Sequence, residues 1–167
     1  MCVLLLCLVI TNKAEASTKS VYITFDDGPT FITSQLLDVL KKENAKATFF
    51  VVGKEIEGRE AILKRIYDEG HSIGVHTYSH NFGKIYCNEE NFIDEMVKTS
   101  NKVKEVTGFT PKILRFPGGS SKRLNQNFLN CLHEKGFKVY DWNSDIYDGE
   151  YPGLSAYRLT ENAKKSK

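Results

Sequence analysis

Two short clusters in this sequence contain the residue types that bind metal ions. Asp26 and Asp27 are adjacent and precede a Gly-Pro pair, so a turn can direct one carboxylate to a metal and the other to proton transfer. Alone, this dipeptide favours a turn whose aspartates bond to the backbone. His76 and His80 lie at i and i+4, where two imidazoles can meet on one face of a helical turn. Together, two imidazoles and a carboxylate predict a three-ligand metal centre with an open position.

A third cluster could hold charge around such a centre. Arg115 precedes the adjacent glycines Gly118 and Gly119. A guanidinium can grip a carboxylate and keep it ionised, and exposed backbone N–H groups can stabilise an oxyanion. A surface arginine before a glycine-rich loop is an equally good interpretation of these residues alone. Trp142, further on, could form one wall of a sugar site or fill the core.

Strands and helices alternate along the rest of the chain and would position these clusters. Short apolar, β-branched or aromatic runs predict five strands, at residues 21–25, 47–52, 71–75, 112–116 and 137–141. Leucine and isoleucine at helical spacing predict helices between them, with Thr33 or Ser34 capping the first and Ser155 capping the last. This alternation predicts an α/β fold with parallel strands. Each cluster follows a strand, where such folds place their chemistry.

These motifs together resemble the polysaccharide deacetylase family, carbohydrate esterase family 4. Thr24–Pro29 (TFDDGP) matches the first family motif and His76–His80 (HTYSH) matches the second. Arg115–Gly119 (RFPGG) resembles the third, although the family usually has an aromatic residue where this chain has Gly118. Asp148 stands at the position of the fourth motif. The resemblance implies a distorted (β/α) barrel over residues 17–167, which we expect to be incomplete at its C-terminal end.

The resemblance also implies roles for individual residues. Asp27, His76 and His80 would bind a divalent metal, with zinc expected, which activates a water as nucleophile. Asp26 would be the general base, and Arg115 would hold its carboxylate.

The remaining motif residues would complete the site. Asp148 would join the catalytic residues. Pro117, Gly118 and Trp142 would contact an N-acetylated polysaccharide or oligosaccharide, and a backbone N–H near Gly118 would stabilise the oxyanion.

The family supplies a further histidine, from a Leu-x-His motif, to protonate the leaving amine, and we find no such motif here. His71 begins a strand and is expected to pack or bond there, while His133 is expected on the outside of a helix. We therefore predict a largely intact metal site with weak or absent deacetylation of peptidoglycan or chitin-like oligomers. Two alternatives stay open: a xylan O-acetyl esterase, and an inactive carbohydrate- or metal-binding remnant.

The first residues differ in character from this domain. An apolar run from Cys2 to Ile10, followed by Ala14-Glu15-Ala16, predicts a signal peptide over residues 1–16 and secretion to the cell envelope or beyond. Cys87 and Cys131 would remain; they could form one disulfide after export, but we expect them to be unpaired. A formal net charge of +2 from 23 basic and 21 acidic residues gives no case for nucleic acid, and no obligate protein partner is evident.

Overall fold

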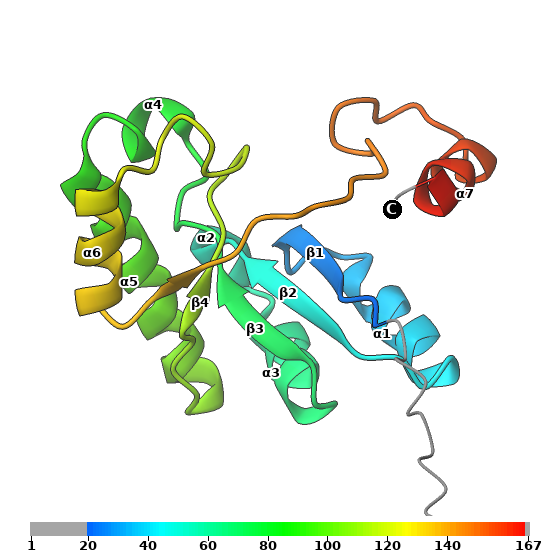
Figure 1. The fold of residues 1–167 in the computed structure, drawn as a ribbon. Helices are drawn as coiled ribbons and strands as arrows, with labels where there is room; N and C mark the ends of the chain where they lie inside the picture. The colour runs from blue at the N-terminus through cyan, green and yellow to red at the C-terminus, as the bar shows by residue number, and fades with distance from the viewer. Residues whose placement is uncertain (1–19, 166–167) are drawn as a thin grey trace, which may run out of the picture.

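The structure, a computed structural model, describes residues 20–165 (Figure 1). Its β-strands are β1 (Ile23–Gly28), β2 (Ala47–Val51), β3 (Ser72–Val75), β4 (Ile113–Leu114) and β5 (Lys138–Val139). Its helices are α1 (Thr33–Lys42), α2 (Gly53–Ile56), α3 (Glu60–Asp68), α4 (Phe82–Ile85), α5 (Glu89–Thr107), α6 (Gln126–Glu134) and α7 (Ala156–Lys165).

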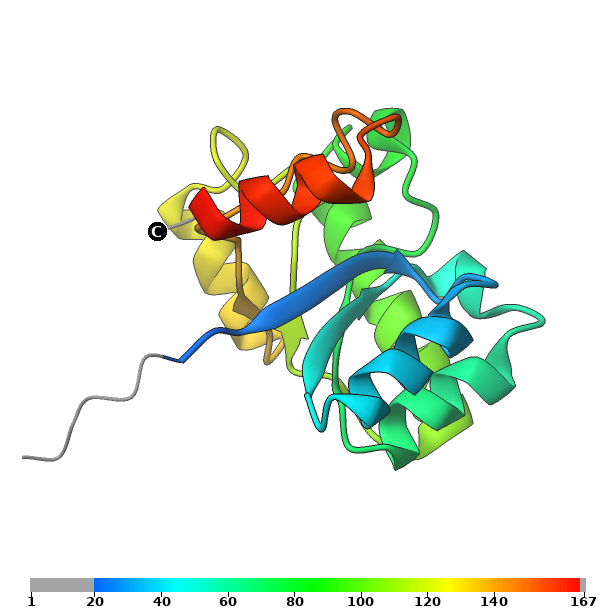
Figure 2. The ribbon, with the colours of Figure 1, turned by 90° about the vertical axis from the view of Figure 1, so that its right-hand side faces the viewer.

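The five strands form one parallel sheet in the order β1-β2-β3-β4-β5. Because sequence order and spatial order agree, the sheet winds in one direction, as in a (β/α) barrel, and does not reverse as in doubly wound folds. Helices α1, α3 and α5 lie side by side along one face of the sheet (Figures 1 and 2). The predicted α/β fold with parallel strands is confirmed.

The hydrophobic core fills the layer between the sheet and these helices. One cluster centres on Phe49 of β2, with Leu37 of α1 and Ile66 of α3 packed around it. A second centres on Phe92 of α5 and Phe116, whose stacked rings are 4.2 Å apart between centroids. These buried side chains fix the helices on the sheet, so the strand ends are held in place from behind.

The opposite face of the sheet carries the residues that support the site. Side chains alternate along a strand, so Phe50 points away from Phe49 and the helices. The Phe50 ring occupies the space left by Gly74 on β3, where an added Cβ would overlap it. The guanidinium of Arg115 lies 4.1 Å above the Phe50 ring. A glycine on β3 therefore gives the aromatic ring, and the cation above it, room on this face.

Several local expectations need correction. Neither Thr33 nor Ser34 caps α1: Ile32 precedes the helix, and the Thr33 hydroxyl instead accepts a hydrogen bond from the Thr30 N–H at 2.8 Å. Helices α2 and α4 were not expected, since four-residue helices are too short to show periodicity. The Ser155 cap is confirmed, because its hydroxyl oxygen accepts from the Arg158 N–H at 3.4 Å.

Helix α7 is peripheral to the sheet (Figure 1). It has no buried residue and stands apart from α1, α3 and α5 (Figures 1 and 2). The signal peptide predicted at residues 1–16 lies outside the described residues. No helix within residues 20–165 is long and apolar enough to cross a bilayer.

We predict that Gly74→Ala destabilises the protein by about 1–3 kcal/mol, the usual cost of overpacking a core. The added methyl must displace the Phe50 ring that supports Arg115. Urea unfolding would measure the effect. Gly149→Ala is the matched control, because no atom lies within 4 Å of its added Cβ. Equal free energies of unfolding in the two variants would contradict the packing of Phe50 against Gly74.

Candidate metal centre and active site

The predicted metal ligands come together at the carboxyl ends of β1 and β3. Asp27 Oδ1 lies 3.4 Å from His76 Nε2 and 3.2 Å from His80 Nε2. All three ligand atoms lie within 4.8 Å of one another. The His76 side chain is 3% exposed, His80 33% and Asp27 64%, so the group is buried on one side and open to solvent on the other.

Asp27 and His80, together with Thr77 in the histidine loop, have left-handed backbone conformations. Asp27 has a φ of 65°, Thr77 64° and His80 51°. Residues 76–80 form a loop, so the expectation that the histidines meet on a helical turn is wrong. Each such residue costs about 1–2 kcal/mol, which the surrounding contacts must offset. These left-handed residues belong to the two turns that bring the three side chains together.

The environment of His76 suits a metal ligand. Its Nδ1 lies 2.9 Å from the backbone oxygen of Arg115 and donates to it, which leaves Nε2 as the lone-pair nitrogen facing Asp27. Burial lowers the pKa of His76 to about 4, although the Asp27 charge opposes the shift. His76 is therefore a neutral imidazole at neutral pH, the form that binds metals.

The three residues fit a divalent metal. Two imidazole nitrogens and one carboxylate oxygen converge, and the exposed Asp27 side leaves space for a further ligand. That donor set is typical of catalytic zinc sites, which keep one position open. Nitrogen and oxygen donors also suit other transition metals, so the arrangement establishes a metal-binding geometry without selecting one ion.

Asp26 faces away from Asp27 and lies against Arg115. Arg115 Nη1 donates to Asp26 Oδ1 at 2.8 Å and to Thr24 Oγ1 at 2.7 Å. Arg115 Nε also donates to the backbone oxygen of Tyr140 at 3.2 Å, beyond β5. Burial raises the pKa of Asp26 above its ordinary value of 3.8; the guanidinium lowers it in part, and the charge of Asp148 raises it. The two adjacent aspartates thus have the separate surroundings that their sequence predicted.

The loop after β4 presents an open backbone donor at Gly118. Gly118 and Gly119 have φ values of 71° and 82°, a conformation that favours glycine. The Gly119 N–H donates to Phe116 O at 2.9 Å, whereas within residues 20–165 the Gly118 N–H has no acceptor. Pro117 is buried and its carbonyl oxygen accepts from the Tyr86 hydroxyl at 2.6 Å. Gly118 thus offers the N–H predicted for an oxyanion, while a substrate contact at Pro117 stays a prediction.

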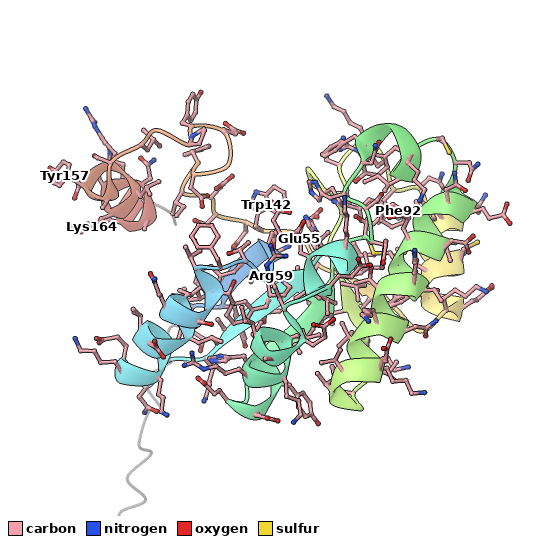
Figure 3. The ribbon with its side chains drawn as sticks, turned by 180° about the vertical axis from the view of Figure 1, so that it is seen from behind. Glu55, Arg59, Phe92, Trp142, Tyr157 and Lys164 are labelled. Atoms are coloured by element: carbon pink, nitrogen blue, oxygen red, sulfur yellow. The ribbon has the colours of Figure 1, made fainter. Side chains whose placement is uncertain are left out.

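The connection after β5 lies across this end of the sheet. Trp142 is 41% exposed and lies beside the strand ends (Figure 3). A Cβ added to Gly119 would lie 3.6 Å from its ring, and the Arg115 guanidinium lies 5.6 Å from the ring centre. Asp141 accepts from the Ser120 N–H at 3.2 Å, which joins this connection to the glycine loop. Exposure favours a site wall over a core position for Trp142.

Residues 13–140 of this chain match the family model for polysaccharide deacetylases.

The chain belongs to the polysaccharide deacetylase family.

Relatives of known name agree with this membership. A peptidoglycan-N-acetylglucosamine deacetylase of Bacillus cereus is 42% identical over 133 residues, covering 80% of this chain and 48% of the relative. Chitin deacetylase 1 of Cryptococcus neoformans is 38% identical over 179 residues, covering 95% of this chain and 37% of the relative. The crystal structure of a polysaccharide deacetylase from Bacillus cereus superposes with a TM-score of 0.80 at 39% identity, covering 85% of this chain and 70% of that one. The chain spans about half the length of the first curated relatives it matches.

The ring of Phe82 lies beside Gly118. Where the family usually has an aromatic residue, a Cβ added to Gly118 would lie 3.4 Å from the ring of Phe82 on α4. Phe82 is 45% exposed, and its ring meets that of His80 edge-on at 5.5 Å. Arg123 donates to the carbonyl oxygens of Gly118 and Gly119 at 3.3 and 3.2 Å. An aromatic ring from a different element therefore lies beside the metal ligands.

Sequence reasoning missed Phe82, Arg123 and Glu95. Glu95 is buried in α5 and accepts hydrogen bonds from the backbone of the histidine loop. A signal for it was available, since Glu95 falls on the apolar stripe that includes Phe92 and Met96. An acid at such a position must have partners if it stays ionised.

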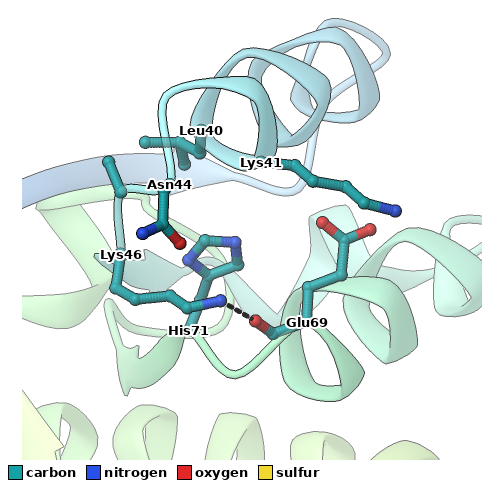
Figure 4. A pocket seen from close by; sticks show the side chains of 7 residues that line it. Leu40, Lys41, Asn44, Lys46, Glu69 and His71 are labelled. Carbon is teal, nitrogen blue, oxygen red and sulfur yellow. Dashed lines mark hydrogen bonds between the residues drawn. The ribbon is translucent and has the colours of Figure 1, made fainter.

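The other histidines lie elsewhere, as expected. His71 precedes β3, at the opposite end of the strands from the ligands, where its Nδ1 accepts from the Ala47 N–H at 3.3 Å. It lines a hollow of 170 Å³ with Lys41, Lys46 and Glu69 (Figure 4). His133 is exposed in the last turn of α6.

The cysteines also follow the expectation. Cys87 and Cys131 are both free and exposed.

We predict that Asp27→Ala and His80→Ala each weaken zinc binding by more than the roughly 10–100-fold that loss of an outer-shell partner costs. Each change removes one of three converging ligand atoms. Isothermal titration of the metal-free protein would measure the affinity. His133→Ala is the matched control and should bind zinc as the wild type does. Unchanged affinity in the Asp27 variant would contradict the assignment of the ligands.

Proposed function

We propose that this chain carries the metal site and general base of a hydrolase that removes N-acetyl groups from amino-sugar polysaccharides, with zinc as the metal. The observation that carries the proposal is the pairing of the Asp27–His76–His80 group with an adjacent Asp26 held by Arg115. The similarity to peptidoglycan and chitin deacetylases supports an N-acetylated β-linked amino sugar as substrate.

Each residue has a defined part in the proposed reaction. A bound divalent ion would supply Lewis acidity, which lowers the pKa of a coordinated water to about 7. Asp27, His76 and His80 would hold that ion. Asp26 takes the proton of the attacking water at Oδ2, because Oδ1 already accepts from Arg115.

The glycine loop and the exposed aromatic ring complete the site. The Gly118 N–H donates to the oxygen of the acetamide as negative charge develops on it. Trp142 offers an exposed ring face on which a sugar can stack. Burial raises the pKa of Asp26 and the charge of Asp148 adds to this effect, which makes that carboxylate a stronger base.

We predict that Asp26→Asn lowers the rate of acetate release by about 10²–10⁴-fold while zinc binding is retained. The amide can still accept from Arg115 but cannot take a proton. The assay follows acetate from N-acetylglucosamine oligomers, with acetylxylan as the competing substrate. Asp68→Asn, at a surface ion pair with Lys64, is the matched control.

The outcomes separate the competing functions. Faster release from acetylxylan would favour the O-acetyl esterase. Zinc binding without acetate release from either substrate would favour a metal-binding remnant. An unchanged rate in Asp26→Asn would rule Asp26 out as the base.

We also propose that the chain is exported, on the strength of the leader-like residues 1–16. N-terminal sequencing of the protein recovered outside the cell should begin at Ser17. Recovery of a chain that starts at Met1 inside the cell would count against export.

A further inference from the structure

Glu95 is an acid buried in the apolar stripe of α5. Its side chain is 4% exposed, between the buried residues Phe92, Met96 and Thr99. A carboxylate in such a place is costly unless hydrogen bonds or an opposite charge compensate for lost water. The hydrogen-bond partners of Glu95 therefore indicate its role.

Within residues 20–165, two of the three partners of the Glu95 carboxylate are in the loop between His76 and His80. Glu95 Oε2 accepts from the Tyr78 N–H at 3.0 Å and from the Ser79 N–H at 2.6 Å. The preceding N–H, of Thr77, lies 3.3 Å from the sulfur of Met96, the next residue on α5. Three consecutive N–H groups of the loop thus point at one turn of α5, and two of them, those of Tyr78 and Ser79, bind the Glu95 carboxylate.

The other carboxylate oxygen has a separate partner. Glu95 Oε1 accepts from Lys84 Nζ at 2.6 Å, and Lys84 belongs to α4, which follows the loop. Burial raises the pKa of Glu95, but the hydrogen bonds from Lys84 and Ser79 outweigh it, and the net pKa lies below its ordinary value of 4.5. One oxygen therefore binds the loop, while the other holds the lysine.

We propose that Glu95 is a positioning residue for the metal site, acting through the Tyr78 and Ser79 N–H groups. Thr77 and His80, on either side of these donors, have the left-handed φ values of 64° and 51°. The bonds to Glu95 stabilise this strained loop and keep His80 Nε2 facing Asp27. The inference rests on the proposed metal site, but Glu95 itself does not contact the metal ligands' ring nitrogens.

Glu95→Ala should lower zinc affinity by about 10–100-fold, as loss of an outer-shell partner does. It should also change the visible absorption spectrum of the Co²⁺-loaded protein, since Co²⁺ absorption reports ligand geometry. Asp94→Asn, the neighbouring exposed acid on α5, is the matched control and should leave both readouts unchanged.

A pair of conservative variants separates positioning from general stability. In Glu95→Gln the amide oxygen can still accept from both loop N–H groups. The amide NH₂, however, would face the Lys84 ammonium, and these two hydrogen-bond donors repel each other. Zinc affinity should therefore fall in Glu95→Gln and recover toward the wild type in Glu95→Gln/Lys84→Met. This comparison carries the test if Glu95→Ala does not fold by circular dichroism.

The results distinguish failure of the role of Glu95 from failure of the metal site itself. Wild-type affinity and an unchanged Co²⁺ spectrum in folded Glu95→Ala, with zinc binding lost in Asp27→Ala, would overturn the role of Glu95 and leave the metal site standing. Absence of zinc binding in the wild type would overturn both. No recovery in the double variant would also count against the role of Glu95.

Discussion

The site depends on the position of Arg115, which lies on the face of the sheet opposite helices α1, α3 and α5. Its guanidinium crosses from β4 over the Phe50 ring and reaches Asp26 on β1. Its backbone oxygen accepts from His76 Nδ1 and so sets which nitrogen of that histidine faces the metal. One residue therefore fixes the general base through its side chain and a metal ligand through its backbone.

The cost of burying this cation is offset at several points. Arg115 is 3% exposed, and it donates to a carboxylate, to the Thr24 hydroxyl and to the Tyr140 carbonyl. The Tyr140 and Thr24 contacts come from the two edges of the sheet, so the guanidinium also joins the edges that the strand order separates. Removing it would leave the half-buried Asp26 without its cation, which is costlier than losing a surface pair.

The fold and the convergence of Asp27, His76 and His80 were predictable because they depend on local patterns. The apolar run Ala47–Val51 indicates a buried strand, and the spacing of apolar residues in α5 indicates a helix. Residue type and spacing likewise indicate a metal site at Asp27, His76 and His80. The loop geometry was not predictable in this way. The histidines meet through left-handed residues and not on a helical turn, because Glu95, 15 residues beyond His80, stabilises the loop from a separate helix. Phe82 was missed for a related reason, since its place beside Gly118 exists only once α4 packs against the loop after β4.

The central claim is that Asp27, His76 and His80 together bind one metal ion, and X-ray absorption of the zinc-loaded protein tests it most directly. The account predicts a shell of nitrogen and oxygen at about 2.0–2.2 Å, with the outer scattering of two imidazole rings and no sulfur. A shell with sulfur at about 2.3 Å, or one without imidazole scattering, would contradict it.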